Sequence, residues 1–272
     1  MRASSRSTTR PLSDPQLWIL FFIFFFNFIA FGMVIPMAPE MVTFYLAEDA
    51  DRLLFTGPVI GKLLSETDLN LPVFFGGLLA TLFACAQYFA SPLWGSLSDR
   101  GGRKPILLAS SLAMAASQLI WVFADTLELF LLSRFLTGVS SGCIAVVAAA
   151  IADLTRAEDR LTGMNILAIG FGMGWTLAPL VGGLCITVDP LEWFPELARL
   201  GVTPFSFAAG VAVTISLINV ILISFGFRES LAETDATEAQ PLRLHLKLWP
   251  RLPEANYNRL DLVFFFFVFS YA

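Results

Sequence analysis

Charged residues, histidine and cysteine are all scarce in this sequence of 272 residues, and each shortage excludes a class of protein. Only 14% of the residues are charged, whereas 56% are hydrophobic, and the mean hydropathy is +0.72. A soluble domain cannot hide so much apolar surface, because its exterior has to be polar. The lipid bilayer is therefore the expected surroundings. The net charge of −5 carries no basic signature for nucleic acid, so we expect no nucleic-acid partner.

The sequence also lacks the residue patterns of metal sites and enzymes. Cys85, Cys143 and Cys185 lie in apolar runs without paired spacing, which predicts buried free thiols rather than a metal site or a disulfide framework. The single histidine, His245, lies in a polar stretch. There is no phosphate-binding loop of the Walker type, no Ser-His arrangement and no carboxylate pair near a membrane substrate. We expect no metal, no cofactor and no enzymatic activity.

Long apolar runs are what the sequence does contain. A helix needs about 20 mostly apolar residues to cross a bilayer, and six complete candidates occur: 17–38, 71–94, 105–124, 129–151, 162–186 and 203–226. The sequence predicts an all-α membrane protein with these parts: an N-terminal segment 1–16, a six-helix bundle 17–228 with an outer loop 40–70, a polar linker 229–260, and the start of a truncated seventh helix at 261–272.

The positions of lysine and arginine predict the orientation, because these residues concentrate in cytoplasmic loops. Most of those outside the spans lie in the segments 1–16, 95–104, 152–161 and 227–260. The other side has only Arg52, Lys62 and Arg199. We expect a cytoplasmic N-terminus and a multi-pass protein of the plasma membrane, such as a bacterial inner membrane.

One charged loop, "GSLSDRGGRKP", follows the second span. Topology alone explains its cations but neither its acidic residue nor its spaced glycines. The pattern resembles the signature loop of the major facilitator superfamily, at the expected place in a six-helix half; its residues are Gly95, Asp99, Arg100, Gly102, Arg103 and Lys104. The resemblance implies a cytoplasmic gate that closes two halves on each other, two inverted three-helix repeats in this half, and a C-terminal six-helix half as partner.

The fourth span carries the one full charge well inside any of the six predicted spans. Arg134 lies about five residues in from the outer end, roughly 8 Å deep at 1.5 Å per residue. Intramembrane charges are costly and usually functional, although a long side chain can also reach back to the interface. Together with Gly138 and Gly142, Arg134 resembles the fourth-helix motif of the family, in which the arginine is tied to proton coupling.

The fifth span carries small residues at four-residue spacing and a proline, which predicts a closely packed, kinked helix. The residues are Gly170, Gly174, Ala178, Pro179, Gly182 and Gly183. They resemble the fifth-helix motif of exporters, with Ala178 where that motif usually has glycine. A purely structural stripe is the alternative.

Other stretches resemble tetracycline exporters with twelve helices. Asn27, in "FFNFIAFGMVIPMAP", stands where those exporters have an aspartate; asparagine cannot carry a proton, so we expect it to line the cavity or bridge helices. Gln87 precedes "YFASPLWG" in the second span. "IADLTRAEDRLTG" resembles the loop after their fourth helix, and the resemblance places Asp153 and Arg160 in the inner charge cluster.

The leading hypothesis is the N-terminal half of a drug/proton antiporter that exports amphipathic small molecules by alternating access. Asn27 and Arg134 are then the polar points of a cavity rich in Phe and Met. Protons are the expected coupling ion, although no predicted span contains Asp or Glu in its core. The alternatives are a metabolite importer or facilitator of the same fold, and a non-transporting membrane scaffold or receptor.

Overall fold

The computed structural model describes residues 14–48 and 71–231. Within these ranges the chain is helical: α1 (Pro15–Gly32), α2 (Ala38–Glu48), α4 (Leu71–Gly101), α5 (Arg103–Val122), α6 (Leu127–Ser141), α7 (Ile144–Leu154), α8 (Arg160–Cys185), α9 (Pro190–Trp193), η1 (Pro195–Leu200), α10 (Ser206–Ile221) and η2 (Leu222–Gly226). The expected seventh helix 261–272 and most of the linker 229–260 lie outside the described residues.

Six helical stretches are long and apolar enough to cross a membrane, which confirms the predicted number of spans. Several bounds differ from the prediction, and two of the predicted spans are interrupted. The first span ends at Gly32, and the region expected as an outer loop begins as the helix α2. The fourth span is broken at Gly142 and Cys143 into α6 and α7, where short-range turn bonds replace the helical ladder.

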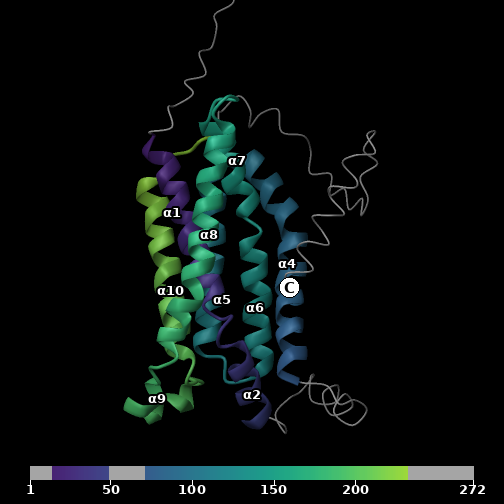
Figure 1. Ribbon diagram of the computed structural model, residues 1–272, viewed down its shortest axis with the longest axis vertical. Coiled ribbons are helices and arrows are strands. Elements are labelled where there is room, and N and C mark those ends of the chain that lie inside the picture. The colour runs from purple at the N-terminus through teal and green to yellow at the C-terminus, as the bar shows by residue number, and fades with distance from the viewer. Residues whose placement is uncertain (1–13, 49–70, 232–272) are drawn as a thin grey trace, which may run out of the picture.

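The six spans form one bundle in which segments distant in sequence lie side by side (Figure 1). Helix α1 packs against α8 and α10, α4 packs against α6, and α5 packs against α6 and α10. Numbered one to six, the span pairs with the most extensive contacts are 1–5, 1–6, 2–4, 3–4 and 3–6. If spans 1, 2 and 3 are exchanged with spans 4, 5 and 6, the same set of contacts results. Corresponding spans run in opposite directions, so the two three-helix units are related as inverted repeats.

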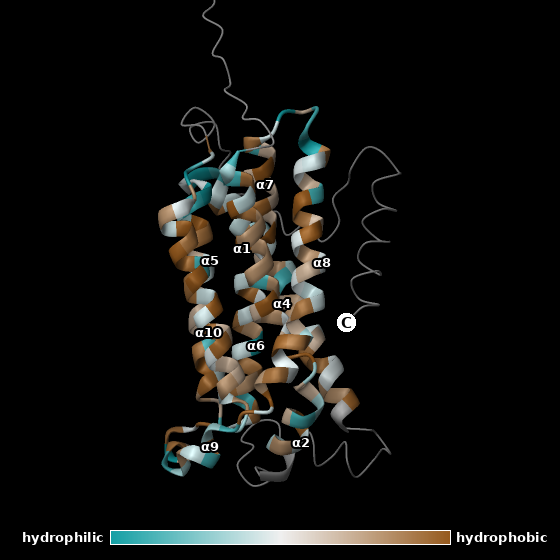
Figure 2. Cartoon of the chain, turned by 60° about the vertical axis from the view of Figure 1, so that its left-hand side comes forward, coloured by the Kyte–Doolittle hydropathy of each residue, from teal (hydrophilic) through white to brown (hydrophobic). Residues whose placement is uncertain are grey.

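Hydrophobic residues run along the helices, and hydrophilic residues gather at the two ends of the bundle (Figure 2). One buried cluster lies around Met37, Tyr45 and Trp121 near α2; another lies around Leu17, Ile151 and Phe227 at the opposite end. We call that opposite end, which holds residues 99–104, 153–160 and 224–231, the latch end. The three cysteines are free; Cys143 and Cys185 are buried and Cys85 is half-buried.

Candidate functional site

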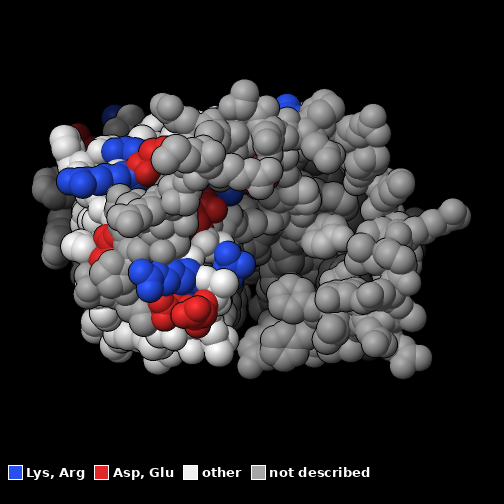
Figure 3. All heavy atoms as spheres, turned by 90° about the horizontal axis from the view of Figure 1, so that it is seen from above, with Lys and Arg blue, Asp and Glu red and all other residues white. Residues whose placement is uncertain are grey.

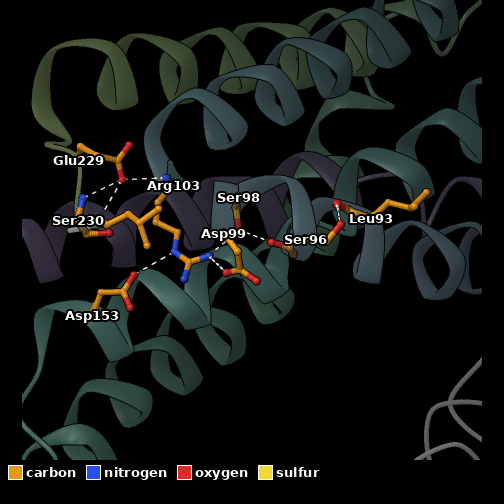
Figure 4. A network of polar contacts seen from close by, with 10 residues as sticks. Leu93, Ser96, Ser98, Asp99, Arg103, Asp153, Glu229 and Ser230 are labelled. Atoms are coloured by element: carbon orange, nitrogen blue, oxygen red, sulfur yellow. Dashed lines mark hydrogen bonds and ion pairs between the residues drawn. The ribbon is translucent and has the colours of Figure 1, made fainter. Parts of the chain in front are cut away.

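The charged residues of the latch end surround Arg103, the first residue of α5. Its Nε donates to Asp153 Oδ2 at 2.9 Å, and its Nη1 donates to Asp99 Oδ1 at 2.5 Å and to Ser98 Oγ at 2.7 Å. The Arg103 side chain is 7% exposed, whereas that of Asp99 is 58% exposed. Figure 4 shows the guanidinium between the carboxylates of Asp99 on α4 and Asp153 on α7. One cation thus joins three helices through charge-assisted bonds.

The other residues of the charged loop have separate positions. Gly102 has a φ of +92° and forms the sharp corner between α4 and α5, a conformation that favours glycine. Lys104 Nζ donates to the carbonyl of Ser224 at 2.9 Å, at the end of the sixth span. Arg100 is exposed. Seen from the latch end, acidic and basic side chains lie close together on this face (Figure 3).

Two residues expected in the charged cluster make no contact with it in the described part of the chain. A Cβ at Gly95 would meet no atom within 4 Å, so the space beside this glycine is open in this bundle. Arg160 is exposed at the first residue of α8 and makes no hydrogen bond or ion pair with the described residues. The structure therefore brings Asp153, but not Arg160, to the charges around Arg103.

Arg134 lies on α6 and points between helices rather than to the bundle surface. It is 2% exposed. Its Nη2 donates to Gln118 Oε1 at 2.8 Å and to Ser133 Oγ at 3.0 Å, and its Cζ lies 4.6 Å from the centre of the Trp121 ring. No carboxylate pairs with it within the described ranges. Its Nε and Nη1 atoms are buried without a hydrogen-bond partner there. In this geometry the side chain is buried between helices and does not reach the bundle surface.

Gln118 links Arg134 to the first span. Its Nε2 donates to the carbonyl of Ala30 at 3.2 Å, three residues along α1 from Asn27. Asn27 is 8% exposed, and no hydrogen bond of its side chain is formed within the described residues. Gln87 makes a long contact, 3.5 Å, from Nε2 to the carbonyl of Ser141, beside the break in the fourth span. Arg134 and Gln118 thus form the polar contact between α5 and α6 that also reaches α1.

Four small residues of α8, spaced four positions apart, face α1 between Phe21 and Met33. A Cβ at Gly174 would lie 2.9 Å from the carbonyl of Phe25, and one at Gly182 would overlap the carbonyl of Met33. Gly170 faces Phe21, and the Ala178 methyl group lies where a Cβ on Gly32 would come within 2.6 Å. Gly183 faces open space, and Pro179 lies inside the helix, which continues to Cys185.

The contact of α6 with α4, which the repeat symmetry relates to the contact of α8 with α1, also depends on glycine. A Cβ at Gly138 would lie 2.6 Å from the carbonyl of Phe83, and one at Gly142 would lie 2.9 Å from the amide of Ser91. Trp94 Nε1 donates to the carbonyl of Val139 at 2.7 Å, next to the helix break. Glycines thus set the distance in both symmetry-related pairs, α8 on α1 and α6 on α4.

Sequence reasoning missed three contributors. Gln118 gave no signal, because a single amide in a span has no pattern to mark it. Trp121 was one of several aromatic residues near a span end. Glu229 was counted only as part of an acidic linker, although its position directly after the sixth span places it beside the charged loop.

The chain from residue 14 to residue 272 matches the family model described as Major Facilitator Superfamily. A mouse relative, major facilitator superfamily domain-containing protein 10, is 26% identical over 97% of this chain and 59% of its own length. The tetracycline resistance protein, class B, of Escherichia coli is 31% identical over 67% of this chain and 42% of its own length. The chain thus spans about half the length of the curated relatives that it matches.

A solved structure has the same fold. The human organic anion transporter MFSD10 (TETRAN) superimposes with a TM-score of 0.68 and 24% identity, over 83% of this chain and 50% of its own. The six-helix bundle described here therefore has the fold of about half of that longer chain.

Proposed function

Because this chain belongs to the major facilitator superfamily, we propose that it forms the first of two six-helix bundles of a membrane transporter that works by alternating access. The inverted repeats and the coverage of half the length of its relatives support this assignment. In such a transporter, the two bundles rock about a central site. The partner bundle, the lipid bilayer and a small-molecule substrate are the partners that this function needs.

The observation that carries the proposal is the geometry of the latch end. Arg103 fixes the inner ends of α4, α5 and α7 in one rigid unit, through Asp99 and Asp153. Gly95, about one helical turn before Asp99 on α4, has open space beside it. A rigid charged corner next to an open, side-chain-free surface suits a second bundle that docks there and leaves again.

For the substrate, we propose amphipathic molecules and export coupled to protons. Relatives include proteins named for tetracycline and quinolone resistance, and a structural neighbour named as an organic anion transporter. The glycine face of α8, which resembles the exporter motif, supports export. Arg134 is buried and has no carboxylate partner among the described residues, so its hydrogen bonds can respond to a proton or a substrate charge. We place the latch end and the N-terminus in the cytoplasm of a plasma membrane, on the distribution of Lys and Arg.

The test is Asp99→Asn in the transporter that contains both bundles, reconstituted in vesicles. This change removes the charge that pairs with Arg103 but keeps the shape of the side chain. We expect insertion to be normal and the initial rate of substrate transport to fall at least about tenfold, a change equal to 1.4 kcal/mol. Glu158→Gln, an exposed charge removal on the loop before α8, is the control and leaves transport unchanged. Undiminished transport by Asp99→Asn would remove the latch role.

A further inference from the structure

A carboxylate outside the signature loop ties the end of the sixth span to the start of the third. Glu229 Oε1 accepts a hydrogen bond from the amide of Arg103 at 2.8 Å, and Glu229 Oε2 accepts one from the amide of Lys104 at 3.0 Å. Oε1 also accepts from the amides of Ser230 and Leu231, both at 3.0 Å. The same carboxylate therefore serves the first turn of α5 and the turn that follows η2 (Figure 4).

The start of α5 has amide donors, and the segment after the sixth span supplies a carboxylate acceptor. The first amides of a helix have no acceptor within the helix, and the helix dipole favours a negative charge at that end. Glu229 meets both requirements for α5, whose cap residue, Gly102, has no side chain to do so. Bonds between a carboxylate and amides are stronger than bonds between neutral groups. Glu229 is thus the capping group of α5, supplied from more than a hundred residues away.

The glycine at position 102 makes this approach possible. A Cβ built on Gly102 would lie 2.5 Å from Glu229 Oε2, closer than real Cβ contacts come. Its φ of +92° also disfavours any other residue. Because Gly102 has this backbone angle and no side chain, the carboxylate of Glu229 can reach the amides of α5.

Further bonds hold the same junction. Gln16 Nε2 donates to the carbonyl of Gly226 at 3.1 Å, and Gln16 Oε1 accepts from the amide of Arg228 at 2.8 Å. Together with the bond from Lys104 Nζ to Ser224, these contacts fix the exit of the sixth span against α1 and α5. At Arg103 the two networks meet, since its amide bonds Glu229 while its guanidinium bonds Asp99 and Asp153.

We propose that Glu229 is a positioning residue of the latch, which couples the segment after the sixth span to Arg103. The carboxylate does not contact the guanidinium; it acts by holding the backbone from which that guanidinium extends. A pull on the segment after residue 231 therefore moves the start of α5 and, with it, the bonds from Arg103 to Asp99 and Asp153. The anchoring stands on the contacts above, whereas its consequence for transport rests on the proposed function.

The anchoring is tested by thiol labelling, which needs no transport. Cys85, Cys143 and Cys185 are replaced by serine, and Ser230→Cys supplies the reporter, because the Ser230 Oγ atom is buried. Labelling with a small soluble maleimide is then timed on the purified chain in detergent. Glu229→Gln keeps the size of the side chain but loses its charge and one acceptor oxygen. We expect labelling about tenfold faster than in the parent, equal to 1.4 kcal/mol of lost anchoring.

Two further variants complete the labelling experiment. Gly102→Ala displaces the carboxylate without altering Glu229, and we expect faster labelling there as well. Glu158→Gln removes one negative charge from the same end of the bundle, and we expect it to leave the rate unchanged. All variants are compared as monomeric protein of equal helix content. Should Gly102→Ala not reach that state, Glu229→Gln decides the result alone. Equal labelling rates in Glu229→Gln and its parent would overturn the anchoring.

Transport kinetics test the positioning role separately, in the transporter that contains both bundles. We expect Glu229→Gln to lower the maximal rate several-fold with KM unchanged, because substrate contacts are not affected. Fast labelling together with an unchanged maximal rate would overturn the positioning role. A parent protein that moves no substrate contradicts the proposed function instead, while the labelling result for the anchoring still stands.

Discussion

At the scale of single residues, the two buried arginines have opposite surroundings. Arg103 has carboxylates on two sides, whereas Arg134 has an amide, a hydroxyl and two aromatic rings within the described part of the chain. An unpaired charge buried in a bundle costs several kcal/mol. An ionisable residue in such a position is by default a candidate functional residue. Arg103 is therefore suited to hold helices together, whereas Arg134 is suited to change its hydrogen bonds when a proton or a substrate charge comes near.

Arg134→Lys tests this difference. Lysine keeps the charge but has neither the planar fork nor the reach to bond Gln118 while lying over Trp121. We expect transport by the two-bundle protein to fall about tenfold or more, a loss of at least 1.4 kcal/mol, and proton movement, followed with a pH-sensitive dye, to fall with it. Arg199→Lys, at an exposed position on η1 at the α2 end of the bundle, is the control and changes neither. Normal proton movement in Arg134→Lys would remove the coupling role.

At the scale of elements, hydropathy predicted the spans but not how they end or break. The number of spans follows from apolar run length, which is a local property of the sequence. The break between α6 and α7 depends on the contact of Gly142 with α4 and on the bond from Trp94 to Val139. The early end of α1 at Gly32 has a local cause, because Pro36 has no N–H for the Gly32 carbonyl and its ring would clash with that carbonyl. Contacts between distant segments thus account for the break in the fourth span, whereas a proline in the sequence marked the end of α1.

The contact of α8 with α1 offers a matched pair of glycines. Gly174 is closed in by Phe25 and Phe28, whereas Gly172 has nothing within 4 Å. Alanine at either position gains helix propensity, by up to about 1 kcal/mol. At Gly174 that gain is exceeded by overpacking, which costs about 1–3 kcal/mol.

We expect Gly174→Ala to lower the melting temperature of the purified chain and Gly172→Ala to keep or raise it. Thermal unfolding followed by circular dichroism in detergent measures both. Equal melting temperatures in the two variants would contradict the tight packing of α8 on α1.

At the scale of the whole molecule, the bundle has two helices that are little buried by it. Only 22% of the apolar window of α4 and 28% of that of α8 are buried, against 56% for α1. These are the second spans of the two inverted repeats, so the symmetry of the bundle places both at its margins. Charge placement and motif spacing predicted which loop carries the charged cluster around Arg103. The partner of Arg134 and the anchor of Arg103 were not predictable, because Gln118 and Glu229 reach them only through the packing of separate spans.

A substitution at Gly95 tests whether a partner bundle docks on the exposed side of α4. Since no atom of the described residues lies within 4 Å of its Cβ position, Gly95→Leu leaves the packing of this bundle unchanged, and we expect its stability to change by less than about 0.5 kcal/mol. In the two-bundle protein, the added side chain fills the space for the partner helix, and we expect transport to be lost. Gly101→Leu, which has equally open space but lies about 240° further round α4 at 3.6 residues per turn, is the control and keeps most of the activity. Transport assays in vesicles and unfolding of the isolated chain give the two measurements. A destabilised chain would show that Gly95 packs within this bundle, and unchanged transport would show that no partner approaches α4 at this point.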